Sequence, residues 1–180
     1  MRVKMPRRNI ELKARDPDPE RSLQVALEVG ALDEGWLQQT DTYFRVPQGR
    51  LKLREEGPVA QLISYERANE TVARESRYRL VDVSDPAGLK DALSDALGVL
   101  VVVEKSRHLL LWQGVRIHLD VVRGLGSFIE IEAVADPTSD LSIESRRASE
   151  LQDALAITPE RLVAFSSSDE LLRPVRDGAR

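Results

Sequence analysis

The chain has 180 residues, no cysteine and a formal net charge of −4, and we expect one domain over residues 1–180, with residues 1–8 as a loose basic tail. The acidic balance argues against generic nucleic-acid binding, and the lack of cysteine excludes disulfides and leaves oxygen as the main ligand for any metal. No apolar stretch follows the basic tail, which argues against a secretory signal or a membrane span and favours a cytoplasmic location.

The first half of the sequence predicts strands with one helix among them. Asp18 is a typical N-cap, Pro19 fits the first helical position, and Gly30 is typical of a helix end. Turn residues at 47–49 and a break at 57–58 separate the later strands. The predicted strands are 9–15, 33–39, 40–46, 50–55 and 60–66.

The second half predicts a polar loop over 69–76, a strand over 77–83 and then a helix that begins at Asp85 and Pro86 and ends at Gly98. The predicted buried face of that helix is Leu89, Leu93, Ala96 and Leu97. Further strands are predicted over 99–107, 108–112, 115–123 and 127–134, followed by a helix over 140–156 and short helical pieces. Hairpin-like connections between strand groups indicate an antiparallel α+β protein.

Charged residues recur at strand spacing in five of these segments. The alternating charges are Glu11, Lys13 and Arg15; Arg50, Lys52 and Arg54; Lys105 and Arg107; His118 and Asp120; and Glu130 and Glu132. Residues two apart on a strand point to the same face, so each strand has one apolar and one charged face. One interpretation is a sheet whose charged face lies in water, with edge charges and cross-strand pairs that bind nothing. The other is a barrel with the charges inside, forming a tunnel for a polyanion and its metal.

The sequence resembles the CYTH superfamily, the triphosphate tunnel enzymes, which includes class IV adenylate cyclases, thiamine triphosphatases and inorganic triphosphatases. The resemblance rests on five motifs in order: residues 9–13, residues 41–44, residues 51–56, residues 103–107, and the hairpin from His118 to Glu132. Segments 74–78 and 166–172 are similar to the bacterial cyclase-like branch. The resemblance implies an antiparallel β-barrel tunnel of about eight strands with flanking helices.

The same resemblance implies a set of site residues and a Mg²⁺ or Mn²⁺ cofactor. The phosphate-binding candidates are Lys13, Arg50, Lys52, Arg54, Arg67, Lys105 and Arg107, of which Lys13, Arg54 and Lys105 are the catalytic candidates. The metal-binding candidates are Glu11, Asp120, Glu130 and Glu132. Three positions depart from the family pattern. Asn9 stands where the family opens with a first glutamate, and Lys52 stands where many members have arginine. The strand after the basic strand has no obvious lysine, and Arg67 is the candidate substitute for it.

Three functions follow from the resemblance. The first is a class IV-like adenylate cyclase, which converts ATP to cyclic AMP and pyrophosphate, and the second is a triphosphatase acting on inorganic, thiamine or nucleoside triphosphate. The third is a tunnel that has lost catalysis and binds a phosphorylated or other anionic ligand, an alternative motivated by Asn9. The expected partner is a nucleotide or polyphosphate rather than a nucleic acid or a membrane, and a homodimer is expected from the resemblance alone.

Overall fold

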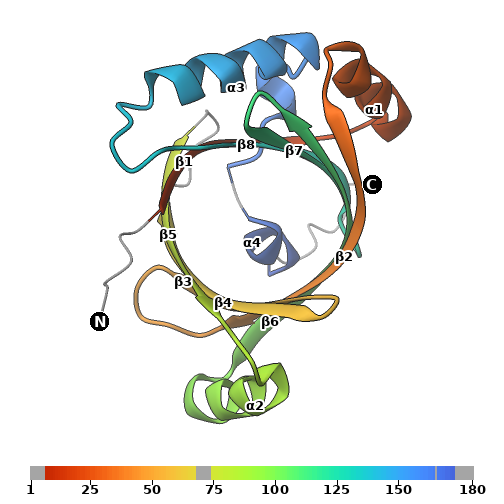
Figure 1. Ribbon diagram of the computed structural model, residues 1–180. Coiled ribbons are helices and arrows are strands. Elements are labelled where there is room, and N and C mark those ends of the chain that lie inside the picture. Colours follow the sequence, from red (N-terminus) through yellow and green to blue (C-terminus); the bar gives the residue numbers. More distant parts are fainter. Residues whose placement is uncertain (1–6, 68–73, 165, 173–180) are drawn as a thin grey trace.

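The structure is a computed structural model that describes residues 7–67, 74–164 and 166–172. Eight strands close into a barrel in the order β1-β5-β4-β3-β2-β6-β7-β8, with antiparallel pairing between neighbours (Figure 1). The strands are β1 (Arg7–Arg15), β2 (Leu32–Phe44), β3 (Arg50–Glu56), β4 (Val59–Arg67), β5 (Arg74–Asp82), β6 (Val99–Trp112), β7 (Val115–Val122) and β8 (Gly126–Val134). The predicted α+β fold with a closed antiparallel barrel is therefore confirmed.

Two pairs of predicted strands prove to be single long strands. Residues 33–39 and 40–44 belong to β2, which ends two residues before the predicted end at 46, and residues 99–107 and 108–112 belong to β6. Each is one strand because β2 and β6 pair with each other along nearly their whole lengths. A register shift at Asp33 and Gly35, where Gly35 has φ +90, bends the start of β2 without ending it. The predicted loop over 69–76 is wrong at its end, where residues 74–76 belong to β5, and residues 69–73 lie outside the described residues.

Two helices cover one outer wall of the barrel, α1 (Pro19–Glu28) and α3 (Ser142–Ala154) (Figure 1). The side chain of Asp18 accepts a hydrogen bond from the Arg21 backbone N–H, so the predicted N-cap begins α1. The outward apolar residues of β1, β7 and β8 pack with the buried residues of these helices. The main members of this core are Leu12, Ala14, Ala26, Ile117, Leu119, Ile129, Ile131 and Leu151. Because this apolar core occupies the outside of the wall, the charged faces of the same strands must point inward.

The helix α2 (Pro86–Leu97) lies on the opposite outer wall, where it contacts β2 and β3 (Figure 1). Its predicted apolar stripe is not buried as expected, since Leu89, Leu93 and Leu97 are half-buried and Ala96 is exposed. A single helix on a curved barrel wall has no neighbour to cover its sides, which explains the difference.

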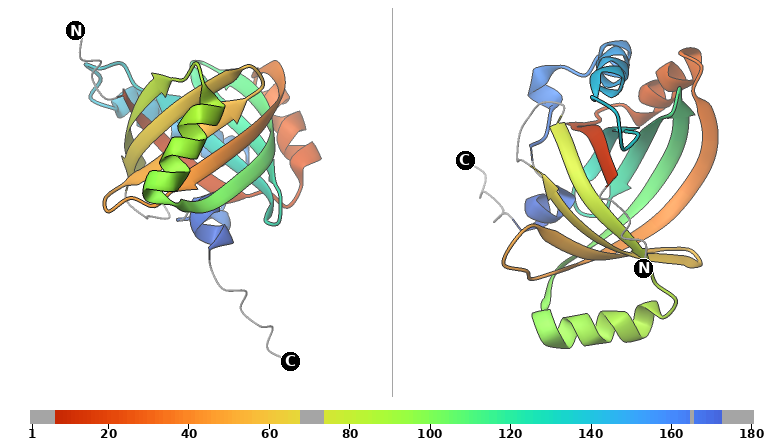
Figure 2. Two further views of the ribbon diagram at one scale, coloured as in Figure 1. Left: turned by 90° about the horizontal axis from the view of Figure 1, so that it is seen from below. Right: turned by 60° about the vertical axis from the view of Figure 1, so that its left-hand side comes forward.

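The last described segment closes one end of the barrel (Figure 2). It consists of a 3₁₀ turn (Pro159–Arg161) and the short helix α4 (Ser167–Leu171), which begins with a capping box at Ser166 and Asp169. Near this end a second apolar cluster is formed by Tyr43, Val103, Val122, Phe128 and Val163. In the described part of the chain, no helix has the length and apolar character needed to cross a membrane.

Candidate active site

The barrel encloses a cavity of about 440 Å³ that is lined by inward-facing side chains from all eight strands. The predicted charges that line it are Glu11, Lys13, Lys52, Arg54, Lys105, Arg107, Glu130 and Glu132. Asn9, Gln39, Asp41, Glu56, Arg116 and His118 add further polar groups. The charged strand faces are thus not solvated outer faces, and positive and negative groups line the tunnel in nearly equal numbers.

Asp120 is almost completely buried inside the barrel and holds two cations of β6. Its Oδ1 accepts a hydrogen bond from Arg107 Nε at 2.7 Å, and its Oδ2 accepts from Arg107 Nη2 at 2.6 Å and from Lys105 Nζ at 2.9 Å. Burial alone would raise the pKa of Asp120, but Arg107 and Lys105 outweigh it and hold the pKa below its ordinary value. Asp120 is therefore an ionised partner for two cations.

Asp41 of β2, which is not among the site residues predicted from the sequence, makes the same contacts with two cations of β3. Its Oδ1 accepts from Arg54 Nε at 2.8 Å, and its Oδ2 accepts from Arg54 Nη2 at 2.8 Å and from Lys52 Nζ at 2.7 Å. Burial would raise its pKa, yet Arg54 and Lys52 keep the pKa well below the usual range. The sequence gives little sign of this role, because Asp41 opens a run of buried residues, Asp41 to Phe44, in a motif whose other members are not acidic.

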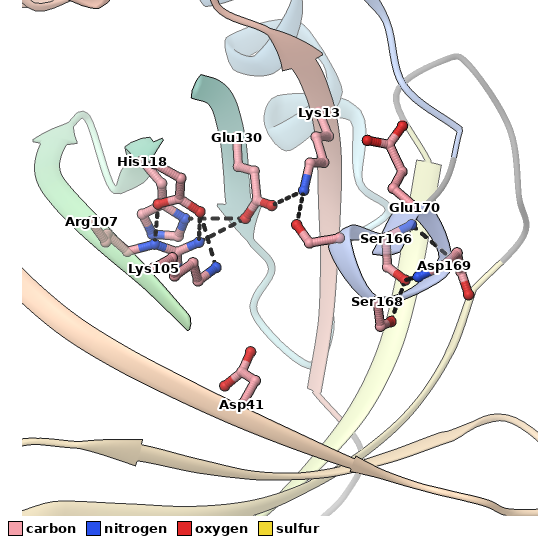
Figure 3. Close-up of polar contacts among 12 residues, drawn as sticks. Lys13, Asp41, Lys105, Arg107, His118, Glu130, Ser166, Ser168, Asp169 and Glu170 are labelled. Carbon is pink, nitrogen blue, oxygen red and sulfur yellow. Dashed lines mark hydrogen bonds and ion pairs between the residues drawn. The ribbon is translucent and has the colours of Figure 1, made fainter. Parts of the chain in front are cut away.

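Glu130 contacts two cations and an imidazole that come from three strands (Figure 3). Its carboxylate lies 3.1 Å from Lys13 Nζ, 2.8 Å from Arg107 Nη2 and 3.8 Å from His118 Nδ1. Burial would raise the pKa of Glu130, but Lys105 and Lys13 hold it well below its ordinary value. Burial and the nearby Arg107 lower the pKa of His118, so the imidazole is neutral near pH 7.

The two tunnel lysines next to these groups are also perturbed. Lys13 donates a hydrogen bond to Ser167 Oγ at 2.6 Å and lies over the Phe128 ring, with Nζ 4.3 Å from its centroid. Burial lowers the pKa of Lys13, and burial together with Arg107 lowers the pKa of Lys105. A cation that is held in a desolvated site is well suited to bind an anion that enters the tunnel.

A more acidic wall is formed where β1 meets β8. Glu11 lies directly opposite Glu132 in the strand register, and Asn9 Nδ2 donates to Glu132 Oε1 at 2.6 Å. That hydrogen bond leaves the buried Asn9 Oδ1 without a partner. The other Glu132 oxygen accepts from Arg116 Nη1 at 3.2 Å. This wall offers only oxygen ligands, which are the ligands that Mg²⁺ and Mn²⁺ prefer.

Within the described residues, no three carboxylate or imidazole groups converge closely enough to hold a metal ion by themselves. Mg²⁺ is commonly bound through one or two carboxylates, with substrate phosphates and water supplying the remaining ligands. Glu11, Glu130 and Glu132 fit such a site, and the partnerless Asn9 Oδ1 adds a neutral oxygen to the same wall. Asp120 fits it less well, because it is absent from the cavity lining and its oxygens accept three hydrogen bonds from Arg107 and Lys105.

Two predicted phosphate-binding residues stand apart from this cluster. Arg50 lies at the α4 end, where it binds Asp169 at 2.8 Å, stacks over Tyr65 and lines a second cavity. The side chain of Arg67 lies outside the described residues, although its backbone ends β4. The structure thus brings Lys13, Lys52, Arg54, Lys105 and Arg107 into one tunnel and leaves Arg50 at its closed end.

The closed antiparallel barrel with a charged interior is the architecture of triphosphate tunnel proteins. Comparison with protein-family profiles matches residues 7–163 to the CYTH domain, and the chain belongs to the CYTH family. A search of curated proteins found no match.

Solved structures with the same fold include proteins from several organisms. The PH1012 protein of Pyrococcus horikoshii OT3 is 22% identical, with a TM-score of 0.80 over 89% of this chain and 98% of that one. A candidate adenylate cyclase from Vibrio parahaemolyticus is 19% identical, with a TM-score of 0.75 over 94% and 99%. HpAC1 from Hippeastrum, a candidate adenylyl cyclase described as having a dominant triphosphatase activity, is 16% identical, with a TM-score of 0.55 over 82% and 87%. At these identities the likeness shows the fold alone.

Proposed function

We propose that the tunnel is the active site of a metal-dependent enzyme that acts on a triphosphate, and that hydrolysis is the reaction it supports best. The observation that carries this proposal is the convergence of Lys52, Arg54, Lys105 and Arg107 with Lys13 on one enclosed cavity. Phosphoryl transfer needs mostly positioning and charge stabilisation from the protein, and lysine and arginine side chains supply both.

The near balance of charge in the tunnel supports a requirement for metal. A triphosphate brings several negative charges into a cavity whose own cations are matched by carboxylates. In a desolvated site such an excess of one sign is unfavourable, so a divalent cation must enter with the substrate. Glu11, Glu130 and Glu132 would hold Mg²⁺ or Mn²⁺, which when bound neutralises phosphate oxygens and lowers the pKa of water.

The residues of the chain have distinct roles in this proposal. Arg54 and Lys105 contact phosphate oxygens and stabilise the charge that develops on them, and Lys13 does the same from β1. Lys52 and Arg107 bind and orient neighbouring phosphates. The segment around α4 closes one end of the tunnel, which limits the entry of bulk water from that side.

Cyclisation of ATP is the second candidate. Tyr65 and Tyr78 lie opposite each other in the register of β4 and β5, and both line the tunnel. Their rings offer aromatic surface on which a nucleobase can stack. A cyclase also has to hold the ribose 3′-hydroxyl in line with the α-phosphorus, whereas hydrolysis only needs water at the terminal phosphorus.

The deciding experiment is product analysis with ATP, inorganic triphosphate and thiamine triphosphate, each with Mg²⁺, Mn²⁺ or chelator. Lys13→Ala and Glu130→Ala are the test variants, and Glu104→Gln, on the outer face of β6, is the matched control. Metal-dependent orthophosphate, lost in both test variants and kept in the control, supports hydrolysis. Cyclic AMP with pyrophosphate would instead favour the cyclase, and no product from folded protein would contradict the enzyme assignment and favour a binding tunnel.

A further inference from the structure

Two Lys-x-Arg pairs in the tunnel share one geometry. Lys52 and Arg54 lie on β3, and Lys105 and Arg107 lie on β6. In both pairs an aspartate of the next strand stands directly opposite the arginine in the register: Asp41 of β2 opposite Arg54, and Asp120 of β7 opposite Arg107. The same local arrangement therefore occurs twice in one barrel.

The atoms that make the contacts are also the same. In each pair the aspartate Oδ1 accepts from arginine Nε, and Oδ2 accepts from both arginine Nη2 and lysine Nζ, with all six distances between 2.6 and 2.9 Å. A guanidinium has five N–H donors, so a two-point contact with aspartate fixes its plane and leaves donors for a ligand. Each aspartate thus fixes the direction in which a lysine and an arginine face.

Both aspartates are almost completely buried, with 2% of Asp41 and 1% of Asp120 exposed. Burying an ion pair costs desolvation free energy, and well-packed apolar residues often serve stability equally well or better. Stability alone is therefore a weak reason for two such buried groups. Fixed cations facing a cavity, in contrast, are what binding of an anion requires.

We propose that Asp41 and Asp120 are positioning residues, each of which holds one Lys-x-Arg pair as a preformed phosphate clamp, and that the two clamps act on one polyphosphate chain. This inference rests on the proposed function, because it concerns the same tunnel. It also assigns Asp120 to the support of cations instead of to the metal.

The placement of the clamps along β2 explains why they act on a chain of phosphates. Four inward residues of β2 pair with the members of the two clamps. Tyr43 and Asp41 stand opposite Lys52 and Arg54 of β3. Gln39 and Leu37 stand opposite Lys105 and Arg107 of β6. The nearest members, Arg54 and Lys105, are offset by two residues along β2, roughly 7 Å, and lie on the strands to either side of it, each roughly 5 Å away, with both side chains directed into the cavity. A linear chain of phosphates can reach both clamps, whereas a single phosphate occupies one.

Positioning and simple charge make opposite predictions for Asp41→Asn. Removing a negative charge makes the tunnel more positive, so a purely electrostatic role for Asp41 predicts tighter polyanion binding. Loss of a clamp predicts weaker binding, because Lys52 and Arg54 are no longer held in place. Arg54→Lys and Arg107→Lys keep the charge but lose the two-point contact, and they serve as second variants if Asp41→Asn does not fold.

The experiment measures the apparent Kd of tripolyphosphate and of pyrophosphate, from the rise in Tm with ligand concentration, both with Mg²⁺ and with chelator. The proteins are wild type, Asp41→Asn, Arg54→Lys, Arg107→Lys, the double variant Asp41→Asn/Arg54→Lys, and the control Asp33→Asn. Asp33 is an aspartate of β2 that binds His108 away from the tunnel. Hydrolysis or cyclisation is assayed in parallel.

We expect wild type and Asp33→Asn to prefer tripolyphosphate over pyrophosphate. Each clamp variant should bind tripolyphosphate roughly 10- to 100-fold more weakly and lose much of that preference. The double variant should be no weaker than its single variants, because one contact is broken in all of them. Unchanged chain-length preference in the variants, or tighter binding by Asp41→Asn, would overturn the clamps. Binding without turnover would overturn the proposed reaction alone, and no binding by wild type would overturn both.

Discussion

Two ion pairs join β6 to a neighbouring segment, and they lie on opposite faces of the barrel wall. The inner pair joins β6 to β7, and the outer pair joins β6 to the turn after β7. Arg107 and Asp120 meet inside, where their side chains are 5% and 0% exposed, whereas Arg123 and Glu104 meet outside, where they are 82% and 48% exposed. Glu104 and Lys105 are adjacent in sequence and point to opposite faces. Identical chemistry thus occurs in water on one face and in a desolvated cavity on the other.

The difference in exposure indicates which of the two ion pairs contributes to the function of the protein. An exposed pair gains little free energy because water and salt screen it and because two long side chains must be ordered. A buried pair in a polar network is rigid, and breaking it leaves an uncompensated charge. The inner pair therefore determines the geometry of the tunnel, and the outer pair serves as its natural control.

The largest expected effect comes from breaking the inner pair. Asp120→Asn should lower the free energy of unfolding by about 3–5 kcal/mol, because Arg107 and Lys105 lose their shared anion. Glu104→Gln should cost about 1 kcal/mol or less. Urea unfolding of both variants measures the difference, and equal losses would contradict the contrast between the two faces.

The next largest effect concerns activity. Lys13 and Arg15 both lie over the Phe128 ring, but Lys13 faces the tunnel and Arg15 binds Glu170 at the surface. Lys13→Met should lower kcat/KM on the triphosphate substrate about 100-fold, since a cation next to the reacting phosphates is lost. Arg15→Met should change it only a few-fold. Steady-state kinetics on the folded variants tests this, and similar losses in both would place Lys13 outside the site.

The stability gap between wild type and Asp120→Asn should also depend on pH. The folded-state pKa of Asp120 lies below its ordinary value of 3.8, so its stabilising contribution is fully present above pH 3.8. The contribution is lost as the pH falls from 3.8 through the lower folded-state pKa. We expect the gap to narrow over that range and to stay constant from pH 5 to 8, as measured by urea unfolding. A gap that is independent of pH down to pH 2 would mean that the lost interaction is not ionic.

The smallest effect is expected at the closed end of the tunnel. Ser167→Ala removes the hydroxyl that accepts a hydrogen bond from Lys13 and should cost about 1–2 kcal/mol of unfolding free energy. Ser142→Ala, in the first turn of α3 on the outer surface, is the matched control and should change little. A thermal unfolding scan of both variants is sufficient, and an unchanged Tm for Ser167→Ala would show that this contact does not stabilise the end of the tunnel.

The strands and their separate apolar and charged faces could be predicted from the sequence, because alternation at Glu11 and Lys13, or at Glu130 and Glu132, defines the two faces of a strand, although it does not say which face points inward. Closure of the barrel was indicated by the resemblance and is confirmed by the pairing of β1 with β8. Periodicity alone did not give it, since closure depends on register between distant strands. For the same reason the sequence predicts two short strands in place of β2 and two in place of β6, since only the pairing between these two strands shows that each is continuous.

Within the site, the identities of the charged residues were easier to predict than their partners. Asp41 was missed because its partners, Lys52 and Arg54, lie on another strand and only the register brings them together. The signal that was available is the repeat itself, a Lys-x-Arg pair and an isolated aspartate on each of two strand pairs. Arg50 was grouped with Lys52 and Arg54 by spacing, although its position at the end of β3 turns it toward α4.

The most direct test of the central claim is a crystal structure of the protein with tripolyphosphate bound. We expect the phosphates to lie inside the barrel, with oxygens on Lys52 and Arg54 at one clamp and on Lys105 and Arg107 at the other. Asp41 and Asp120 should keep their contacts. Phosphates bound on the outer surface, or bound inside with the two aspartates released from their arginines, would contradict this claim.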